Sequence, residues 1–290
     1  MAMISKDEML ARVVDPILEA MKEGKLLWLQ GWNVGAGAGL PYNPTKASNK
    51  QAYRGAVNNI LMWFASAANG WGDPRWMGFA QAKTKGWRVR KGEESTQIYA
   101  PIMGSYPIEE NGQKVWRKYV KGFNPVHVFN AQQVDGIPAI EKAGTLDVST
   151  GYAAAEDMYK AMNVQTIHGG NVAAYAYQVD IIRMPEPEMF VGADEYHATR
   201  LHEMGHATGH PSRMDRRMFG TGLQDYAQEE LVAELFAAFA CADIGVSKAE
   251  MTQNHAAYLK SWHERLSREP KAFIDAVSAA WEAFEFVRKL

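Results

Sequence analysis

The chain has 290 residues, 47% of them hydrophobic and 22% charged, which is the composition of an ordinary globular protein. Its length suits one large domain or two of usual size. No apolar run approaches the roughly 18–20 residues of a membrane span, and the N-terminus lacks the apolar core of a signal peptide. The only cysteine, Cys241, cannot form an internal disulfide. We therefore expect a cytoplasmic protein without a membrane partner.

The net charge of −2 conceals an uneven distribution. Residues 1–135 hold 17 Lys and Arg against 11 Asp and Glu, a net of +6, and seven of the nine tryptophans. Residues 136–290 hold 14 against 22, a net of −8. A basic, aromatic-rich half joined to an acidic half predicts two domains with different partners. We expect a first domain over 1–135, a linker over 136–150 and a second domain over 151–290.

The first half combines helical and strand-like segments. Ser5 and Glu8 have the spacing of a capping box and precede an apolar repeat of helical period. Asn111-Gly112 is a strong signal for a tight hairpin turn between two strand-like runs. The expected elements are helices over Ser5–Lys25 and Ala52–Ala68, and strands over Gln97–Pro101 and Val126–Phe129.

The second half is expected to be mainly helical with a small sheet, so that the whole chain belongs to the α+β class. Between Val172 and Met184, bulky residues alternate with small or polar ones, which predicts one strand. Pro185 ends it. The expected helices are Tyr152–Met162, Ala193–Thr208, Asp225–Ile244, Lys248–Ser267 and Pro270–Leu290.

The most informative motif is His202-Glu203-Met204-Gly205-His206. Because His202 and His206 are four residues apart, both imidazoles project from one face of a helix and can bind a single ion. Glu203 lies where a carboxylate can take a proton from water held by that ion. This is the HExxH pattern of zinc peptidases, so Glu203 is the predicted catalytic base.

A catalytic zinc needs a third protein ligand and one open position. A template with a third histidine ten residues after the first fails, because Ser212 occupies that position. The alternative takes a glutamate from a following helix, and Glu230 fits this role. Glu234 shares its helix face and is expected to accept the free N–H of a ligand histidine. Glu229 and, more weakly, His210 are the other candidates for the third ligand.

Two histidines with a glutamate from a later helix look like the site of thermolysin-type peptidases, the gluzincins. This donor set favours Zn²⁺, although Mn²⁺ or another divalent metal stays open. The alternative is that Glu230 and Glu234 face solvent and bind no metal. They interrupt an apolar run, however, and a carboxylate there is costly to bury without a cation or donors.

Residues 53–91 interleave cations with flat rings, as binding of single-stranded nucleic acid requires. The competing interpretation is equally physical, because tryptophans often belong to a core and charge runs often face solvent. The residues predicted to contact single-stranded DNA are Tyr53, Arg54, Trp76, Arg88, Arg90 and Lys91.

Several of these segments together resemble the plasmid antirestriction proteins of the ArdC family. They are Tyr196–Arg213, Tyr226–Leu235, Tyr53-Arg54-Gly55, Asp73–Trp76 and Gly86–Glu93. The resemblance covers almost the whole chain. It implies an N-terminal domain that binds single-stranded DNA, a C-terminal zincin-like domain, and protection of incoming conjugative plasmid DNA from host restriction.

Three functional hypotheses follow. In the first, the C-terminal half is a metallopeptidase of HExxH type that acts on a host protein or peptide. In the second, the protein only binds single-stranded DNA, and the metal stabilises the C-terminal fold. In the third, the acidic half imitates DNA and binds a restriction enzyme directly, although its excess charge is modest for that role.

Overall fold

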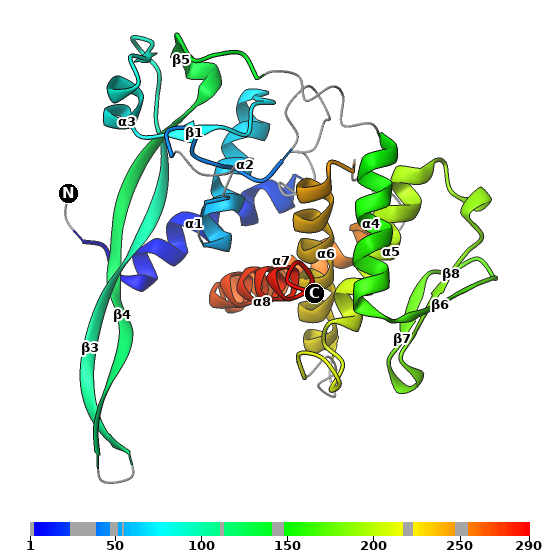
Figure 1. Ribbon diagram of the computed structural model, residues 1–290. Helices are drawn as coiled ribbons and strands as arrows, with labels where there is room; N and C mark the ends of the chain where they lie inside the picture. The colour runs from blue at the N-terminus through cyan, green and yellow to red at the C-terminus, as the bar shows by residue number, and fades with distance from the viewer. Residues whose placement is uncertain are drawn as a thin grey trace.

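The computed structural model describes residues 3–23, 39–46, 52–53, 55–110, 113–140, 148–216, 223–246 and 255–290. Figure 1 shows a long β-hairpin at one side of the molecule, a small sheet at the other, and helices between them. This arrangement confirms the predicted α+β class. Among the described helices, none combines the length and apolar character needed to span a bilayer.

Helix α1 (Lys6–Lys22) begins where the capping pattern predicts. The Ser5 hydroxyl accepts a hydrogen bond from the backbone N–H of Glu8 at 3.1 Å, which satisfies one of the free donors of the first turn. Met9, Val13 and Ile17 repeat at helical spacing and are buried. The helix is therefore confirmed, while its predicted end at Lys25 lies outside the described residues.

Strands β3 (Thr96–Glu110) and β4 (Gln113–Asn130) form the hairpin. Glu110 pairs with Gln113, so two residues connect the strands, as the Asn-Gly signal predicts. Asn111 and Gly112 themselves lie outside the described residues. Both strands are much longer than predicted, because their outer parts have no buried face and so lack the alternation that marks a half-buried strand.

The base of the hairpin is joined to the rest of the N-terminal half. Helix α2 (Ala56–Asn69) carries Asn58, whose amide exchanges two hydrogen bonds of 2.9 Å with the backbone of Tyr99 on β3. Strand β1 (Trp76–Met77) pairs with the inner end of β4. The smaller elements are α3 (Phe79–Thr84), β2 (Arg88–Val89) and β5 (Val134–Asp135), of which β2 and β5 pair with each other.

The sheet of the C-terminal half follows helix α4 (Val148–Met162). It consists of β6 (Gln165–His168), β7 (Ala174–Ala176) and β8 (Ile181–Met184), with β8 in the middle. The single strand predicted over Val172–Met184 is wrong. The chain reverses through a 3₁₀ turn, and Asp180 adopts a left-handed conformation with φ 54°. Bulky and polar residues alternate on both sides of the turn, which hides it from a test of periodicity.

Four further helices complete the chain: α5 (Ala193–Ala207), α6 (Leu223–Ile244), α7 (His255–Arg268) and α8 (Lys271–Val287). Each overlaps a predicted helix. Helix α6 is the central one, because every residue from 231 to 242 is buried. A helix that is buried all round must be covered on all sides by other elements. Figure 1 shows it between α5 and the helices of the N-terminal half.

The two halves share one hydrophobic core. Buried residues of α1 and α2 belong to the same cluster as those of α4, α5, α6 and α8. Trp63 on α2 and Phe239 on α6 make a direct ring contact, with centroids 5.3 Å apart. The predicted boundaries at 135 and 151 remain a prediction, but the halves do not sit on independent cores.

Trp63→Ala should therefore destabilise both halves together. Removing a buried aromatic ring costs about 3–5 kcal/mol of unfolding free energy. Urea unfolding can be followed by tryptophan fluorescence, which reports mainly the first half, and by far-UV circular dichroism, which reports mainly the helices. Both probes should show one transition, shifted equally. Phe79→Ala is the control. Because this residue is 59% exposed, its loss should change the free energy of unfolding by less than about 0.5 kcal/mol. Two separate transitions, with only the fluorescence one displaced, would contradict the shared core.

Candidate metal centre

Helix α5 places two histidines side by side. His202 and His206 are one turn apart, with ring centroids separated by 4.9 Å and planes inclined at 82°. Both side chains are 10% exposed. The spacing of four residues puts them on one face, as the sequence predicts. That face is directed at helix α6.

Helix α6 supplies a carboxylate between the two rings. Glu230 Oε2 lies 3.6 Å from His202 Nε2, and Glu230 Oε1 lies 3.5 Å from His206 Nε2. One ligand atom from each of the three residues lies within 4.8 Å of the others. Two ligands about 2.1 Å from Zn²⁺ at a tetrahedral angle are about 3.4 Å apart, so the spacing fits one divalent ion.

The outer nitrogens of both rings face further carboxylates. His202 Nδ1 lies 3.3 Å from Glu234 Oε2, a distance that favours charge attraction although the angle is poor for a hydrogen bond. His206 Nδ1 lies 3.3 Å from Glu229 Oε1. Carboxylates in these positions set the orientation of ligand histidines. The geometry thus favours Glu230 over Glu229 as the third ligand. The role of Glu234 as a hydrogen-bond acceptor for a ligand histidine stays a prediction.

Arg216 holds Glu229 in place, and sequence reasoning missed it. Its guanidinium donates hydrogen bonds of 2.7 and 3.0 Å to the two carboxylate oxygens of Glu229. It also donates to Thr208 Oγ1 and to the backbone oxygen of Gly205, both at 3.0 Å. Arg216 lies in a loop with no periodicity, so no pattern in the sequence connects it with the histidines.

His210, the weaker candidate, is not one of the three clustered donors. Its Nδ1 lies 2.7 Å from Ser212 Oγ and 4.0 Å from Asp180 Oδ2. The loop after α5 turns back toward the β7–β8 connection, where Arg213 forms an ion pair with Asp180. His210 is therefore part of the contact between this loop and the sheet.

Charge at the centre favours a bound cation. Burial lowers the pKa of both imidazoles, but the carboxylates outweigh it. Glu230 and Glu234 raise the pKa of His202, and Glu229 and Glu230 raise that of His206. Although burial raises the pKa of Glu230, its contacts with the two histidines hold it well below the ordinary value. The same field that attracts protons to these rings attracts a divalent ion.

Glu203, the predicted base, is buried next to this cluster. It is 7% exposed, and its charge contributes to the raised pKa of His202 and His206. A buried carboxylate is costly unless a cation or donors compensate its charge. A divalent ion at the cluster would provide that compensation.

The distance between the ligands depends on a close approach of α5 and α6 at Gly205. A Cβ atom at this position would lie 2.9 Å from the Cα of Ala233 and 3.1 Å from Cδ1 of Phe236. The two helices therefore pack backbone against backbone one turn away from Glu230. No larger residue at 205 is compatible with this separation.

The residues of the first half that were predicted to contact DNA differ in their exposure to solvent. Trp76 is fully buried and packs with Met62, Ile98 and Val128, so the prediction that bases stack on it is wrong. The Tyr53 hydroxyl donates a hydrogen bond of 2.9 Å to the backbone oxygen of Trp76, and burial raises its pKa. Arg54 lies outside the described residues. An interleaved pattern of rings and cations does not distinguish rings that form a core from rings that face solvent.

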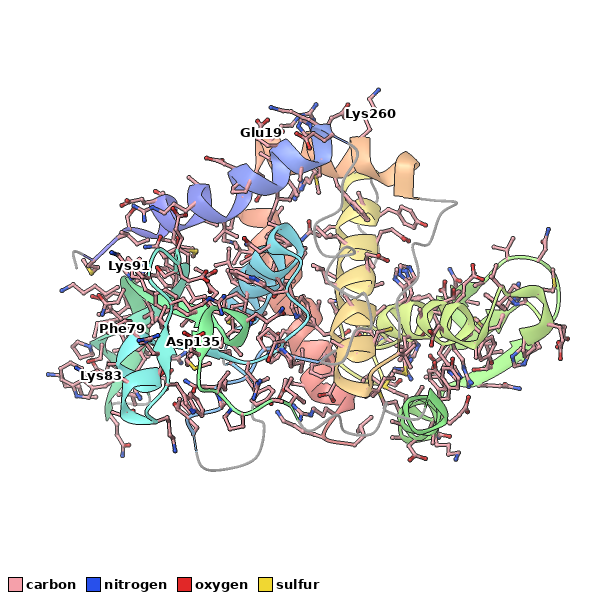
Figure 2. All side chains as sticks on the ribbon, turned by 90° about the horizontal axis from the view of Figure 1, so that it is seen from above. Glu19, Phe79, Lys83, Lys91, Asp135 and Lys260 are labelled. Atoms are coloured by element: carbon pink, nitrogen blue, oxygen red, sulfur yellow. The ribbon has the colours of Figure 1, made fainter. Side chains whose placement is uncertain are left out.

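Arg88, Arg90 and Lys91 are exposed, as a phosphate contact requires. The Arg88 side chain is 84% exposed, although its guanidinium lies 3.6 Å from Asp135. Arg90 is paired with Glu93 at 2.7 Å. Figure 2 shows Lys83 and Lys91 on the same side of the N-terminal half, together with the exposed ring of Phe79. These cations remain candidates for nucleic-acid contact.

Comparison with known families gives one match in each half of the chain. Residues 7–129 match the N-terminal domain of anti-restriction factor ArdC. Residues 153–279 match a zincin-like metallopeptidase family. The second half is therefore zincin-like, as predicted.

Relatives of known sequence extend over nearly the whole chain. Two DNA primases TraC from Escherichia coli are each 33% identical over 95% of this chain. The chain spans only 26% and 19% of those two proteins. Protein y4eC of Sinorhizobium fredii (strain NBRC 101917 / NGR234) is 30% identical over 95% of this chain and 90% of its own length.

Solved structures support the same relationship. The metal-free crystal structure of the antirestriction ArdC protein from plasmid R388 has a TM-score of 0.75 and 28% identity, covering 97% of this chain and 96% of that one. The Mn(II)-bound structure of the same protein has a TM-score of 0.70 and 27% identity, covering 97% of both chains.

Gly205→Ala should weaken metal binding by moving α6 away from α5. The added methyl group meets backbone atoms of Ala233, which cannot move without displacing the helix. We expect a lower melting temperature and at least about tenfold weaker binding of Mn²⁺ or Zn²⁺ by calorimetry. Gly192→Ala at the start of α5 is the control, because a Cβ there meets nothing within 4 Å. Unchanged metal affinity in Gly205→Ala would show that the close approach is not needed.

Removal of the central carboxylate should weaken metal binding most. Glu230→Gln takes away a charged ligand, whereas Glu229→Gln and Glu234→Gln affect only the outer nitrogens, at a cost of about 10–100-fold. The ion must displace protons from His202 and His206, so affinity should rise with pH until the raised pKa values of these rings are passed, which for His202 is about 10. Calorimetry in two buffers of different ionisation enthalpy measures the protons released. A larger loss of metal affinity in Glu229→Gln than in Glu230→Gln would show that Glu229 is the third ligand.

Proposed function

The chain belongs to the ArdC antirestriction family, and from this premise we propose how its two halves act. The N-terminal half binds single-stranded DNA. The C-terminal half is a metallopeptidase of HExxH type that acts on a host protein. Together they protect incoming conjugative plasmid DNA from restriction in the recipient cell.

The observation that carries the catalytic proposal is the cluster of His202, His206 and Glu230 with Glu203 buried beside it. Two imidazoles and one carboxylate are the ligands of catalytic zinc in peptidases, and a fourth position is left for water or substrate. We assign Zn²⁺ as the physiological ion on this donor chemistry. The related structure with Mn(II) bound supports a divalent metal at such a site.

When bound, the ion supplies Lewis-acid chemistry that polarises a peptide carbonyl. The residues of the chain have separate tasks. Glu203 accepts a proton at its carboxylate from the attacking water and then delivers it to the departing amide nitrogen. Glu234 and Glu229 orient the rings of His202 and His206 through the outer nitrogens.

Binding of single strands by the first half rests on its charge and its exposed cations. Residues 1–135 carry a net charge of +6, and Arg88, Arg90 and Lys91 all face solvent. Phosphate contacts from such residues give affinity that does not depend on sequence. The match of residues 7–129 to the N-terminal domain of an anti-restriction factor supports a nucleic-acid partner for this half.

A second candidate function is a DNA-binding protein whose metal site is only structural. It is favoured by the low exposure of the ligands, since each of the three side chains is 10% exposed. A structural site does not need a general base, however, and Glu203 is present in the position of one. The catalytic proposal is therefore preferred.

Glu203→Gln distinguishes the two candidates. This change keeps the shape of the side chain but removes the proton acceptor, so we expect normal metal content, normal DNA binding and loss of DNA protection in a recipient with active restriction. A fall in hydrolysis of about 100-fold or more is expected once a substrate is found. Metal analysis, a single-strand binding assay and a conjugation assay measure the three properties.

The matched control is Glu188→Gln, which removes one exposed carboxylate from the same half and should change none of the three. If protection survives in Glu203→Gln, the centre is architectural and the first half carries the biological role.

A further inference from the structure

The outer part of the β-hairpin forms an arm that nothing in the described chain covers. We define the arm as Met103–Glu110 and Gln113–Lys121. It begins at a bulge between Ile102 and Met103, where the register shifts by one residue on β4. A bulge bends a strand pair, and here it marks the point where the hairpin leaves the body. Figure 1 shows the arm extending away from all helices.

The arm exposes large side chains on both faces. None of its described residues is buried. Trp116 is 60% exposed, Tyr106 49% and Tyr119 45%. Met103, Val115 and Val120 are exposed as well. A two-stranded ribbon without a covered face gains little stability from such residues, so their presence indicates an interaction surface.

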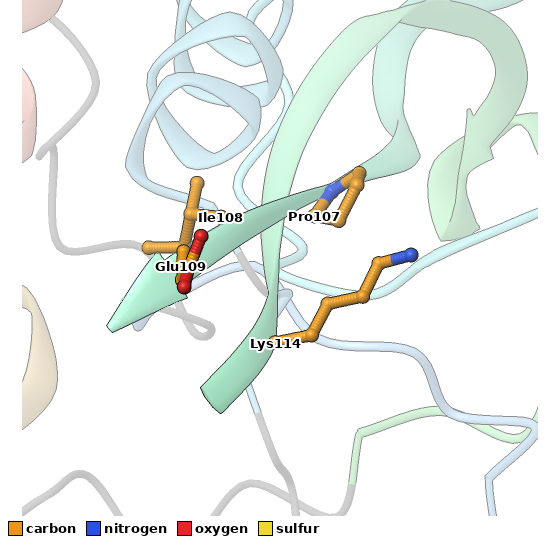
Figure 3. A pocket seen from close by; sticks show the side chains of 4 residues that line it. All are labelled: Pro107, Ile108, Glu109 and Lys114. Atoms are coloured by element: carbon orange, nitrogen blue, oxygen red, sulfur yellow. The ribbon is translucent and has the colours of Figure 1, made fainter. Parts of the chain in front are cut away.

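The register places cations next to these rings. Lys114, Trp116 and Lys118 alternate along β4 and therefore share one face, repeating about every 7 Å. The ammonium group of Lys114 lies 5.6 Å from the centre of the Trp116 ring. On the same face near the tip, Pro107, Glu109 and Lys114 contribute to the lining of an open hollow (Figure 3).

The opposite face also carries aromatic rings next to a cation. Tyr106 and Tyr119 are neighbours, with ring centroids 5.8 Å apart. Arg117 pairs with Tyr106 across the strands and forms an ion pair with Glu110. The Tyr119 ring lies directly over Gly104, where a Cβ would come within 2.6 Å of it. Glycine at 104 thus leaves room for the ring to lie flat on the ribbon.

The arm carries an excess of positive charge. It has four cations, at Lys114, Arg117, Lys118 and Lys121, against two carboxylates, at Glu109 and Glu110. Rings for bases and cations for phosphates are the two elements of sequence-tolerant binding to single strands. A protein that adds a strand to the edge of β3 is a poorer fit, because Pro107 lies on this strand within the arm and offers no N–H.

We propose that this arm is the principal contact for single-stranded DNA, with a base stacked on Trp116 between Lys114 and Lys118. This inference rests on the proposed DNA-binding function of the first half. It places the main DNA contact on the hairpin and not in segment 53–91. The exposed cations Arg88, Arg90 and Lys91 then extend the phosphate path, while Trp76 serves only the core.

The test compares Trp116→Leu with Trp116→Phe. Leucine is apolar but has no flat face, whereas phenylalanine keeps one. With a fluorescein-labelled oligothymidylate, Trp116→Leu should bind roughly 5- to 100-fold more weakly and Trp116→Phe should stay close to the parent protein. On an abasic strand with the same number of phosphates, the parent and both variants should bind alike. Circular dichroism checks that the exposed substitutions leave the fold intact.

A second pair of variants tests the cations. Lys114→Gln combined with Lys118→Gln should reduce the salt dependence of binding, lowering the slope of log affinity against log salt by about 1.4. Lys260→Gln is the matched control, because this exposed lysine lies on α7 in the other half (Figure 2) and should leave the slope unchanged.

The outcomes distinguish a failure of the proposed DNA-binding function from a failure of the inference about the arm. If the parent protein does not bind the oligothymidylate, the proposed DNA-binding function fails. If it binds and Trp116→Leu binds equally well, the arm is not the contact, although the proposed function stands. A change of oligomeric state in Trp116→Leu by sedimentation, with DNA affinity retained, would assign the arm to a protein interface and overturn the inference.

Discussion

The closeness of two helices governs the chemistry that this protein can perform. Helix α5 contributes both imidazoles and helix α6 contributes the carboxylate, so one ion can reach all three only if the helices nearly touch. Gly205 makes this contact possible, because its missing side chain lets the backbone of Ala233 approach. Beyond Glu234, every residue of α6 up to Ala242 is buried in the core. The geometry of the centre is therefore a consequence of core packing.

The proposed DNA contact and the candidate metal centre lie at different places on one shared core. Figure 1 shows the hairpin arm and the sheet β6–β8–β7 at opposite sides of the molecule, with the shared helical core between them. The ring contact between Trp63 and Phe239 joins the halves within that core. The metal centre lies between α5 and α6, away from the arm. Under the proposed function, DNA binding and peptide hydrolysis therefore use separate parts of the chain.

Local signals in the sequence predicted local structure well. The capping pattern at Ser5, the hairpin signal at 111–112 and the histidine pair of α5 depend on neighbours in the chain. The structure contains the capped helix, the paired strands on either side of 111–112 and the neighbouring imidazoles. The errors concern tertiary environment. Nothing in the sequence identifies Trp76 as a core residue, although its ring is fully buried. Arg216 contacts Glu229 only in the folded chain. The length of the arm was missed because a strand without a buried face has no alternation of apolar and polar residues to detect.

Anomalous X-ray diffraction from metal-loaded crystals tests the metal centre formed by α5 and α6 most directly. Data collected at the absorption edge of zinc or manganese should show a strong peak between the Nε2 atoms of His202 and His206 and the carboxylate of Glu230. Glu229 should remain bound to Arg216 and outside the coordination sphere. A peak at another position, or a metal bound by Glu229 in place of Glu230, would contradict the account.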